Sequence, residues 1–206
     1  MAAADIQAFI IPRADEYLGE YVPEHNERLQ WISGFSGSAG MAIILVDRAA
    51  IFVDGRYTIQ VKQQVSSELY EYHHLIDETP IAWLKKKLTR GCVGIDSRLH
   101  SYKWFKETSA ECSAAGLSLL ELPSNPIDDN WHDRPVPERQ LATLLDSQFT
   151  GEPSNAKRQR IGSAIKTAGA DVALVTQLDS IAWLLNIRGN DVPRLPVLLA
   201  TATLKS

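Results

Sequence analysis

The sequence has few cysteines, no excess of basic charge and no long apolar run, and each shortage excludes a class of protein. Two cysteines, Cys92 and Cys112, among 206 residues are too few for a disulfide scaffold. The 21 basic and 25 acidic side chains give a net charge of −4, whereas proteins that bind nucleic acid through its phosphates are usually basic. Apolar runs such as residues 42–46 are far shorter than the roughly 18 residues that cross a bilayer. The N-terminal residues also lack the pattern of a signal peptide. We therefore expect a cytoplasmic protein that binds neither nucleic acid nor membrane.

Composition and charge point instead to a globular protein in two parts. Hydrophobic residues make up 45% of the chain and charged residues 22%, which are ordinary globular values. Residues 1–135 carry 13 basic and 19 acidic side chains, whereas residues 136–206 carry 8 and 6. Prolines 135, 137 and 153 lie near this division, where they disfavour helix. We predict a domain over 1–135, a linker over 136–153 and a partial second domain over 154–206.

The first part alternates between patterns typical of strands and of helices. Two apolar runs separated by Asp47-Arg48 predict a hairpin, and Asp54 is a suitable N-cap for a helix after it. Strands are expected at 7–11, 41–46, 49–53, 93–96 and 117–122, and helices at 26–31, 57–65, 80–88 and 101–115. This alternation predicts an α/β fold, with a mixed β-sheet flanked by helices.

The second part repeats the alternation but is short. We expect a helix capped by Ser154, a strand at 171–176, a helix at 178–186 and a strand at 197–203. Two strands are few for an independent sheet, so the pattern predicts an incomplete second domain of similar α/β type. The sequence Ile-Ala-Trp-Leu occurs at both 81–84 and 181–184, as two related domains would produce.

The glycine-rich segment 34–40 has the wrong order of elements for a phosphate-binding loop. Gly34, Gly37 and Gly40 follow an expected helix and precede a strand, whereas dinucleotide and phosphate loops run from strand to helix. We interpret these three glycines as a close-packed structural turn. The five histidines lack the spacing of metal ligands, so we assign no metal site and no catalytic residue to this chain.

Two charged turns remain as candidate sites. Asp54 and Arg56 join an apolar strand to a helix, and Arg188 and Asp191 lie in a turn that contains glycine and proline. Each pair is consistent with a purely structural role, such as a helix cap or a salt bridge within the turn, and each is also consistent with a binding surface.

Six stretches in order along the chain resemble Xaa-Pro aminopeptidase (aminopeptidase P) of the long, three-domain type. They include WISGFSGSAG at 31–40 and VDGRY at 53–57; the others are 15–22, 93–96, 130–135 and 178–193. The resemblance implies a creatinase/prolidase-type N-terminal domain, followed by an incomplete second domain of the same type.

The resemblance also implies a function for the parent enzyme. In that family a C-terminal domain holds two divalent metals, usually manganese, with two Asp, one His and two Glu, and hydrolyses the bond before proline. We expect that metal-binding catalytic domain to be absent here, so this chain has no cofactor of its own and is inactive alone. Its expected partners are its own catalytic domain, short proline-containing peptides bound through the parent, and a second copy in a homodimer. Asp54, Arg56, Arg188 and Asp191 lie in the matching stretches and become candidates for cleft-rim or interdomain roles.

A second hypothesis belongs to a different functional class. Peptidase-like folds of this family also occur without catalysis as protein- or histone-binding modules, and an acidic first domain fits such a role. The reading frame downstream of Ser206 would distinguish the two hypotheses.

Overall fold

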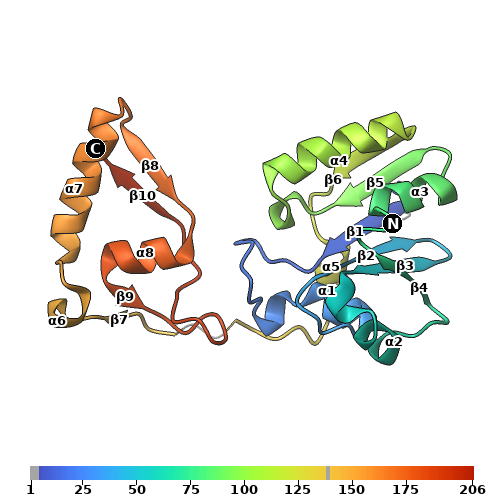
Figure 1. The fold of residues 1–206 in the computed structure, drawn as a ribbon, viewed down its shortest axis with the longest axis horizontal. Helices are drawn as coiled ribbons and strands as arrows, with labels where there is room; N and C mark the ends of the chain where they lie inside the picture. The colour runs from blue at the N-terminus through green and yellow to red at the C-terminus, as the bar shows by residue number, and fades with distance from the viewer. Residues whose placement is uncertain (1–4, 138–139) are drawn as a thin grey trace. The chain divides into compact units, whose positions relative to one another are not determined.

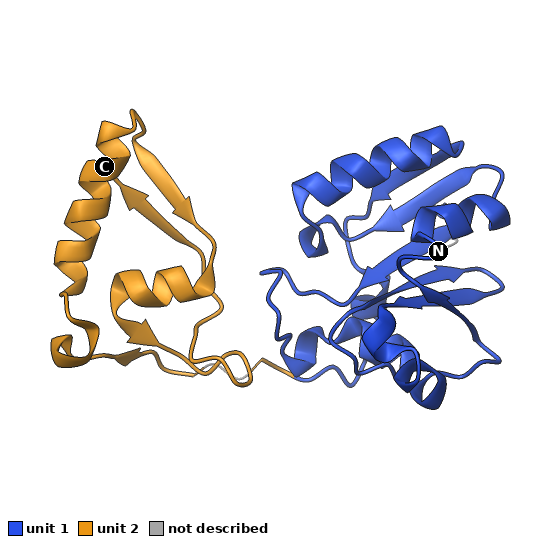
Figure 2. Ribbon diagram, in the orientation of Figure 1, with its two compact units in different colours: residues 1–135 blue, residues 136–206 orange. Residues whose placement is uncertain are grey.

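The chain folds into two compact units, 1–135 and 136–206 (Figure 2). The structure is a computed structural model, and it describes residues 5–137 and 140–206. Each unit is described below by itself.

Unit 1 is built on one six-stranded sheet. In spatial order its strands are β4 (Tyr70–His74), β3 (Ala49–Val53), β2 (Gly40–Leu45), β1 (Ala8–Pro12), β5 (Gly91–Ile95) and β6 (Leu117–Glu121). β2 pairs antiparallel with both β1 and β3, whereas β3–β4, β1–β5 and β5–β6 are parallel. The predicted mixed sheet is confirmed.

Helices cover both faces of this sheet, and the alternation of the strands explains why. In β1, Phe9 and Ile11 face one apolar cluster while Ala8 and Ile10 face the other, as expected for side chains that alternate along a strand. On the first face lie α1 (Arg28–Ser33), α2 (Gln60–Gln64) and α5 (Pro126–Asn130); on the second lie α3 (Pro80–Lys87) and α4 (Tyr102–Ala114) (Figure 1). The result is a three-layer α/β/α domain.

The hairpin and the main helix caps of unit 1 follow the sequence signals. The Leu45 N–H donates to the Arg48 carbonyl and closes the turn at Asp47-Arg48. Ser101 caps α4 by accepting from the Trp104 N–H. Asp54 caps a short 3₁₀ helix, Gly55–Tyr57, rather than α2 itself. Another 3₁₀ turn, Glu24–Asn26, precedes α1, and a third, Ser97–Leu99, precedes α4.

A buried arginine joins the start of α1 to α5. The Arg28 side chain is 1% exposed and bonds Asp128 through Nε at 2.7 Å and Nη2 at 3.0 Å. Its Nη2 also lies 2.9 Å from the Glu16 carboxylate. Asp128, in α5, is therefore the partner of a buried cation, a contact across 100 residues of chain. Buried charges are tolerated when they are paired in this way.

Unit 2 contains two small sheets and two longer helices. One sheet pairs β8 (Val172–Val175) with β10 (Ala202–Lys205), and the other pairs β7 (Thr143–Leu144) with β9 (Ile187–Arg188), both antiparallel. The helices are α6 (Ser147–Thr150), α7 (Ser154–Thr167) and α8 (Leu178–Leu185). Asn186 ends α8 in the left-handed conformation with φ 54°, and its side chain accepts from the buried Lys157 ammonium at 2.7 Å.

Three expectations for this unit differ from the structure. The expected linker 136–153 carries β7 and α6, and β7 is paired with β9. Ser154 does not cap α7, because its hydroxyl donates to the Leu184 carbonyl instead. The expected strand at 197–203 is displaced to Ala202–Lys205. Residues 197–199 instead bond the loop at 189–191: the Asp191 N–H donates to the Val197 carbonyl, and the Leu199 N–H donates to the Asp191 carboxylate. Among the described helices, none is long and apolar enough to cross a membrane.

Candidate functional site

The glycine-rich loop and the Asp54–Arg56 turn, which lie apart in the sequence, meet in space at the end of the hairpin. The loop enters β2 and the turn leaves β3, and these two strands are antiparallel neighbours. The Ser38 and Tyr57 hydroxyls are 2.6 Å apart, and the Phe35 ring meets the Tyr57 ring edge-on at 5.6 Å. The hydrogen bond with Ser38 lowers the pKa of Tyr57.

Each of the three glycines has its own structural reason. Gly34 ends α1 with φ 80°, a left-handed conformation that favours glycine. A Cβ on Gly37 would lie 2.2 Å from Cζ of the buried Phe35, and a Cβ on Gly40 would lie 2.9 Å from Cε1 of the same ring. The loop is therefore packed around the Phe35 ring.

The polar groups of this loop bond within unit 1. The Ser36 N–H donates to the Gln64 side chain at 3.0 Å, and the Gln64 amide donates back to the Ser36 hydroxyl at 2.8 Å. An amide already bonded to a side chain is not free to bind a phosphate.

Asp54 and Arg56 form an ion pair on the surface of the turn. The Asp54 carboxylate accepts from the Arg56 backbone N–H at 2.9 Å and from its Nη2 at 2.7 Å. The hydrogen bonds from Arg56 hold the pKa of Asp54 below its usual range. The guanidinium also lies over the Tyr57 ring, 5.2 Å from its centroid. With Asp54 ionised and paired with Arg56, the two side chains carry no net charge and form a polar surface of hydrogen-bonding groups.

Arg188 and Asp191 lie in unit 2 and are not paired with each other in the part of the chain that the structure describes. Arg188 Nη1 donates to the Ile187 carbonyl at 2.7 Å, and the Asp191 carboxylate accepts from the Leu199 N–H at 2.9 Å. The salt bridge expected as the structural alternative for this turn is absent, and Asp191 instead anchors the segment at 197–199.

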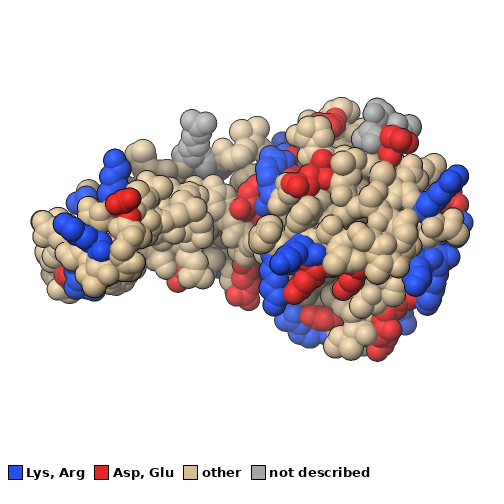
Figure 3. Space-filling model, turned by 90° about the horizontal axis from the view of Figure 1, so that it is seen from above, with Lys and Arg blue, Asp and Glu red and all other residues tan. Residues whose placement is uncertain are grey.

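Neither candidate pair supplies a set of metal ligands. Over residues 5–137 and 140–206, no group of three or more His, Cys, Asp or Glu side chains could hold a metal ion. On the face shown in Figure 3, basic and acidic side chains are interspersed over unit 1 and form no patch of one sign. The residues described here do not fit a dinuclear metal centre, so no step of metal chemistry is assigned to them.

The sequence did not predict one further feature of unit 1, a pocket lined by Trp31, Trp131 and acidic side chains. In the sequence this pocket corresponds only to two tryptophans, each near acidic residues, in stretches 100 residues apart. Neither stretch alone indicates a site.

Comparison with known proteins assigns this α/β chain to a class of domain found in peptidases. Two models of the creatinase/prolidase N-terminal domain match the chain, one over residues 1–122 and one over residues 133–206. The chain belongs to the creatinase/prolidase N-terminal domain family.

Several of the similar proteins are Xaa-Pro aminopeptidases. The chain is 36% identical over 196 residues to Xaa-Pro aminopeptidase ApepP of Drosophila melanogaster, covering 93% of this chain and 32% of that protein. It is 33% identical over 194 residues to Xaa-Pro aminopeptidase app-1 of Caenorhabditis elegans, covering 92% of this chain and 32% of that protein. The crystal structure of X-prolyl aminopeptidase from C. elegans, described as a cytosolic enzyme with a di-nuclear active site, superposes with a TM-score of 0.87 at 30% identity, over 97% of this chain and 33% of that one. The chain thus spans about a third of the length of these relatives.

Proposed function

We propose that this chain serves as the non-catalytic N-terminal part of a cytosolic, metal-dependent Xaa-Pro aminopeptidase, which removes the residue that precedes proline. In this role it packs on the catalytic domain, limits access to the cleft to short proline-containing peptides and contributes to oligomer contacts. The observation that carries the proposal is the similarity in both sequence and fold, over nearly the whole chain, to the N-terminal third of such enzymes.

The chemistry of the proposed parent is assigned to its catalytic domain. There, two divalent metals, manganese in our proposal, would activate the attacking water and polarise the scissile carbonyl.

The candidate residues would act at surfaces rather than in bond cleavage. The Asp54–Arg56 pair and the Ser38–Tyr57 hydroxyls form an exposed polar edge of unit 1, suited to a cleft rim or to a contact with another domain. Arg188 and Asp191 are proposed for the same kind of contact from unit 2.

The direct test is peptidase activity of the purified chain. Incubation with Arg-Pro-Pro and Mn²⁺ should release no free arginine above a boiled control, while a full-length Xaa-Pro aminopeptidase under the same conditions should release it. Turnover that survives repurification of the chain would contradict the proposal.

A second test separates this role from a stand-alone binding module. The transcript that encodes the chain should continue past Ser206 into a region carrying two Asp, one His and two Glu as metal ligands. A stop codon at that position would favour the binding module.

A further inference from the structure

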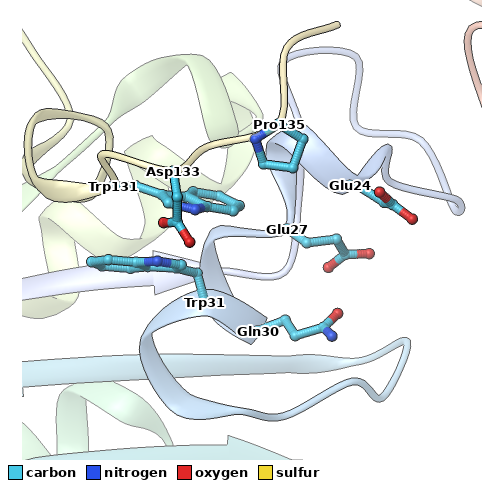
Figure 4. A pocket seen from close by; sticks show the side chains of 7 residues that line it. All are labelled: Glu24, Glu27, Gln30, Trp31, Trp131, Asp133 and Pro135. Carbon is cyan, nitrogen blue, oxygen red and sulfur yellow. The ribbon is translucent and has the colours of Figure 1, made fainter. Parts of the chain in front are cut away.

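Unit 1 contains a pocket that is unrelated to the candidate residues above. It has a volume of about 450 Å³ and is formed by two segments, one around α1 and one that follows α5 (Figure 4). The lining residues are Glu24, Glu27, Gln30, Trp31, Trp131, Asp133 and Pro135.

One wall of the pocket is a pair of stacked tryptophans. The Trp31 and Trp131 ring centroids are 5.7 Å apart and the ring planes differ by 24°. Trp131 is 9% exposed and anchors the pair in the core, whereas Trp31 is 37% exposed. The exposed part of the Trp31 indole is therefore held in place and open to solvent. Such a surface attracts a cation through the ring quadrupole.

The rest of the lining is acidic. Figure 4 shows the Asp133 carboxylate beside the two indoles, with Glu24, Glu27 and Gln30 on the other side of the pocket. Glu27 is paired with Arg13 at 3.2 Å, but Glu24 and Asp133 have no ion-pair partner among the described residues. Two of the three carboxylates that line the pocket thus have no cationic partner over residues 5–137 and 140–206.

An arginine beside the Trp131 ring has partners of its own. The Arg134 guanidinium lies 5.8 Å from the Trp131 centroid. It is paired with Asp128 at 3.0 Å and bonds the His25 carbonyl at 2.6 Å. Its ion pair is thus with Asp128, which does not line the pocket.

We propose that this pocket binds the guanidinium group of an arginine side chain in a peptide or protein partner. A guanidinium is planar, stacks on indole and presents several N–H donors in a fixed fork that matches carboxylates. A quaternary ammonium has no donors and would leave the carboxylates and Gln30 without hydrogen bonds. A lysine ammonium could meet the carboxylates but is not planar and would not stack flat on the exposed Trp31 indole.

The test uses the indole N–H signals of the whole ¹⁵N-labelled chain. Its five tryptophans provide probes inside and outside the pocket. Titration with N-acetyl-arginine amide should shift the Trp31 and Trp131 signals in a saturable way, and should leave those of Trp104 and Trp183 unchanged. N-acetyl-citrulline amide, which has nearly the same shape but no charge, should produce no saturable shift. Absence of the shift with arginine, or an equal shift with citrulline or with N-acetyl-lysine amide, would overturn the proposal.

Two variants test whether arginine binds in this pocket. Trp31→Ala and Glu24→Gln change exposed side chains, and each should weaken arginine binding about two- to five-fold, as expected for one partly exposed cation–π or charge contact. Glu68→Gln removes the same charge from an exposed turn that does not line the pocket, and should bind as the wild type does. If Glu24→Gln and Glu68→Gln bind equally well while both melt like the wild type, the assignment to this pocket is wrong.

Discussion

A single aromatic ring explains why the loop at 34–40 is rich in glycine. Phe35 is 1% exposed, and the chain at Gly37 and Gly40 passes so close to its ring that no Cβ can be accommodated without movement. Only Gly34 of the three has a positive φ. Conformational freedom is therefore the reason for one glycine, and close packing is the reason for the other two.

We expect Gly37→Val to destabilise unit 1 by about 1–3 kcal/mol, the usual cost of overpacking a well-filled core. The added side chain would begin 2.2 Å from Phe35 Cζ, and the ring is enclosed by Leu29 and other core residues. Thermal melting followed by circular dichroism measures the effect. Gly19→Ala is the control, because its Cβ would make only ordinary contacts, the nearest at 3.4 Å. Equal melting temperatures for the two variants would show that the loop can move away from the ring.

The side-chain contacts of the candidate site could be predicted only in part. The Asp54 cap follows from the local sequence, because an Asp before a helical turn accepts from nearby N–H groups. The hydrogen bond between Ser38 and Tyr57 could not be predicted from the local sequence, because it depends on the register of β2 with β3.

At the scale of elements, a histidine packs against the start of α4. His100 lies just before α4, and its ring stacks on the Trp104 ring at 3.7 Å between centroids. Burial lowers the pKa of His100 to about 4, only partly opposed by the charge of Asp96. Its Nε2 is buried without a hydrogen-bond partner among the described residues. The fold therefore holds the neutral form of this imidazole.

This packing predicts a loss of stability in mild acid. Below the ordinary histidine pKa of about 6.5 the unfolded chain binds a proton that the folded chain does not bind until about pH 4. As the pH is lowered, the free energy of unfolding should therefore decrease between about pH 6.5 and about pH 4. Above about pH 6.5 His100 should cause no such decrease. His100→Phe keeps a flat ring against Trp104 and cannot titrate. Urea unfolding at pH 7 and pH 5 measures how much the free energy of unfolding decreases with acid. We expect a smaller decrease for this variant than for the wild type. An equal decrease would show that His100 does not cause the loss of stability.

Elements with strong local patterns were predicted well, and those that depend on distant partners were not. The hairpin and α4 follow from apolar periodicity and turn or cap residues. The strand expected at 197–203 begins later, since buried Val197 and its neighbours bond the loop at 189–191. An apolar run indicates burial but does not indicate which backbone it will pair with.

At the scale of the whole molecule, unit 2 leaves apolar strand surface uncovered. The sheet of β8 and β10 has only two strands, so each strand has an edge without a ladder partner in the described chain. On β8 the side chains of Val172 and Leu174 share one face and are 48% and 65% exposed. Open edges and exposed apolar faces favour pairing with another chain.

We expect this surface to support a homodimer. Light scattering coupled to size exclusion should give about twice the chain mass of 22.9 kDa. Leu174→Lys, which places a charge on the exposed face of β8, should return the protein to the monomer. Val46→Lys adds the same charge at an 83% exposed position of unit 1 and should remain dimeric. A monodisperse species at the monomer mass at high concentration would contradict this prediction.

The sequence by itself determined the α/β class, most strands and helices of unit 1 and the resemblance to Xaa-Pro aminopeptidases, because periodicity, caps, turns and ordered motifs are local properties of the chain. Only the tertiary structure decided that Arg28 is buried against Asp128 and that Trp31 stacks on Trp131. Both contacts join residues 100 positions apart and form only when α1 and the segment around α5 pack on the same face of the sheet. Local sequence patterns carry no information about such long-range contacts, because these contacts depend on strand order and helix packing.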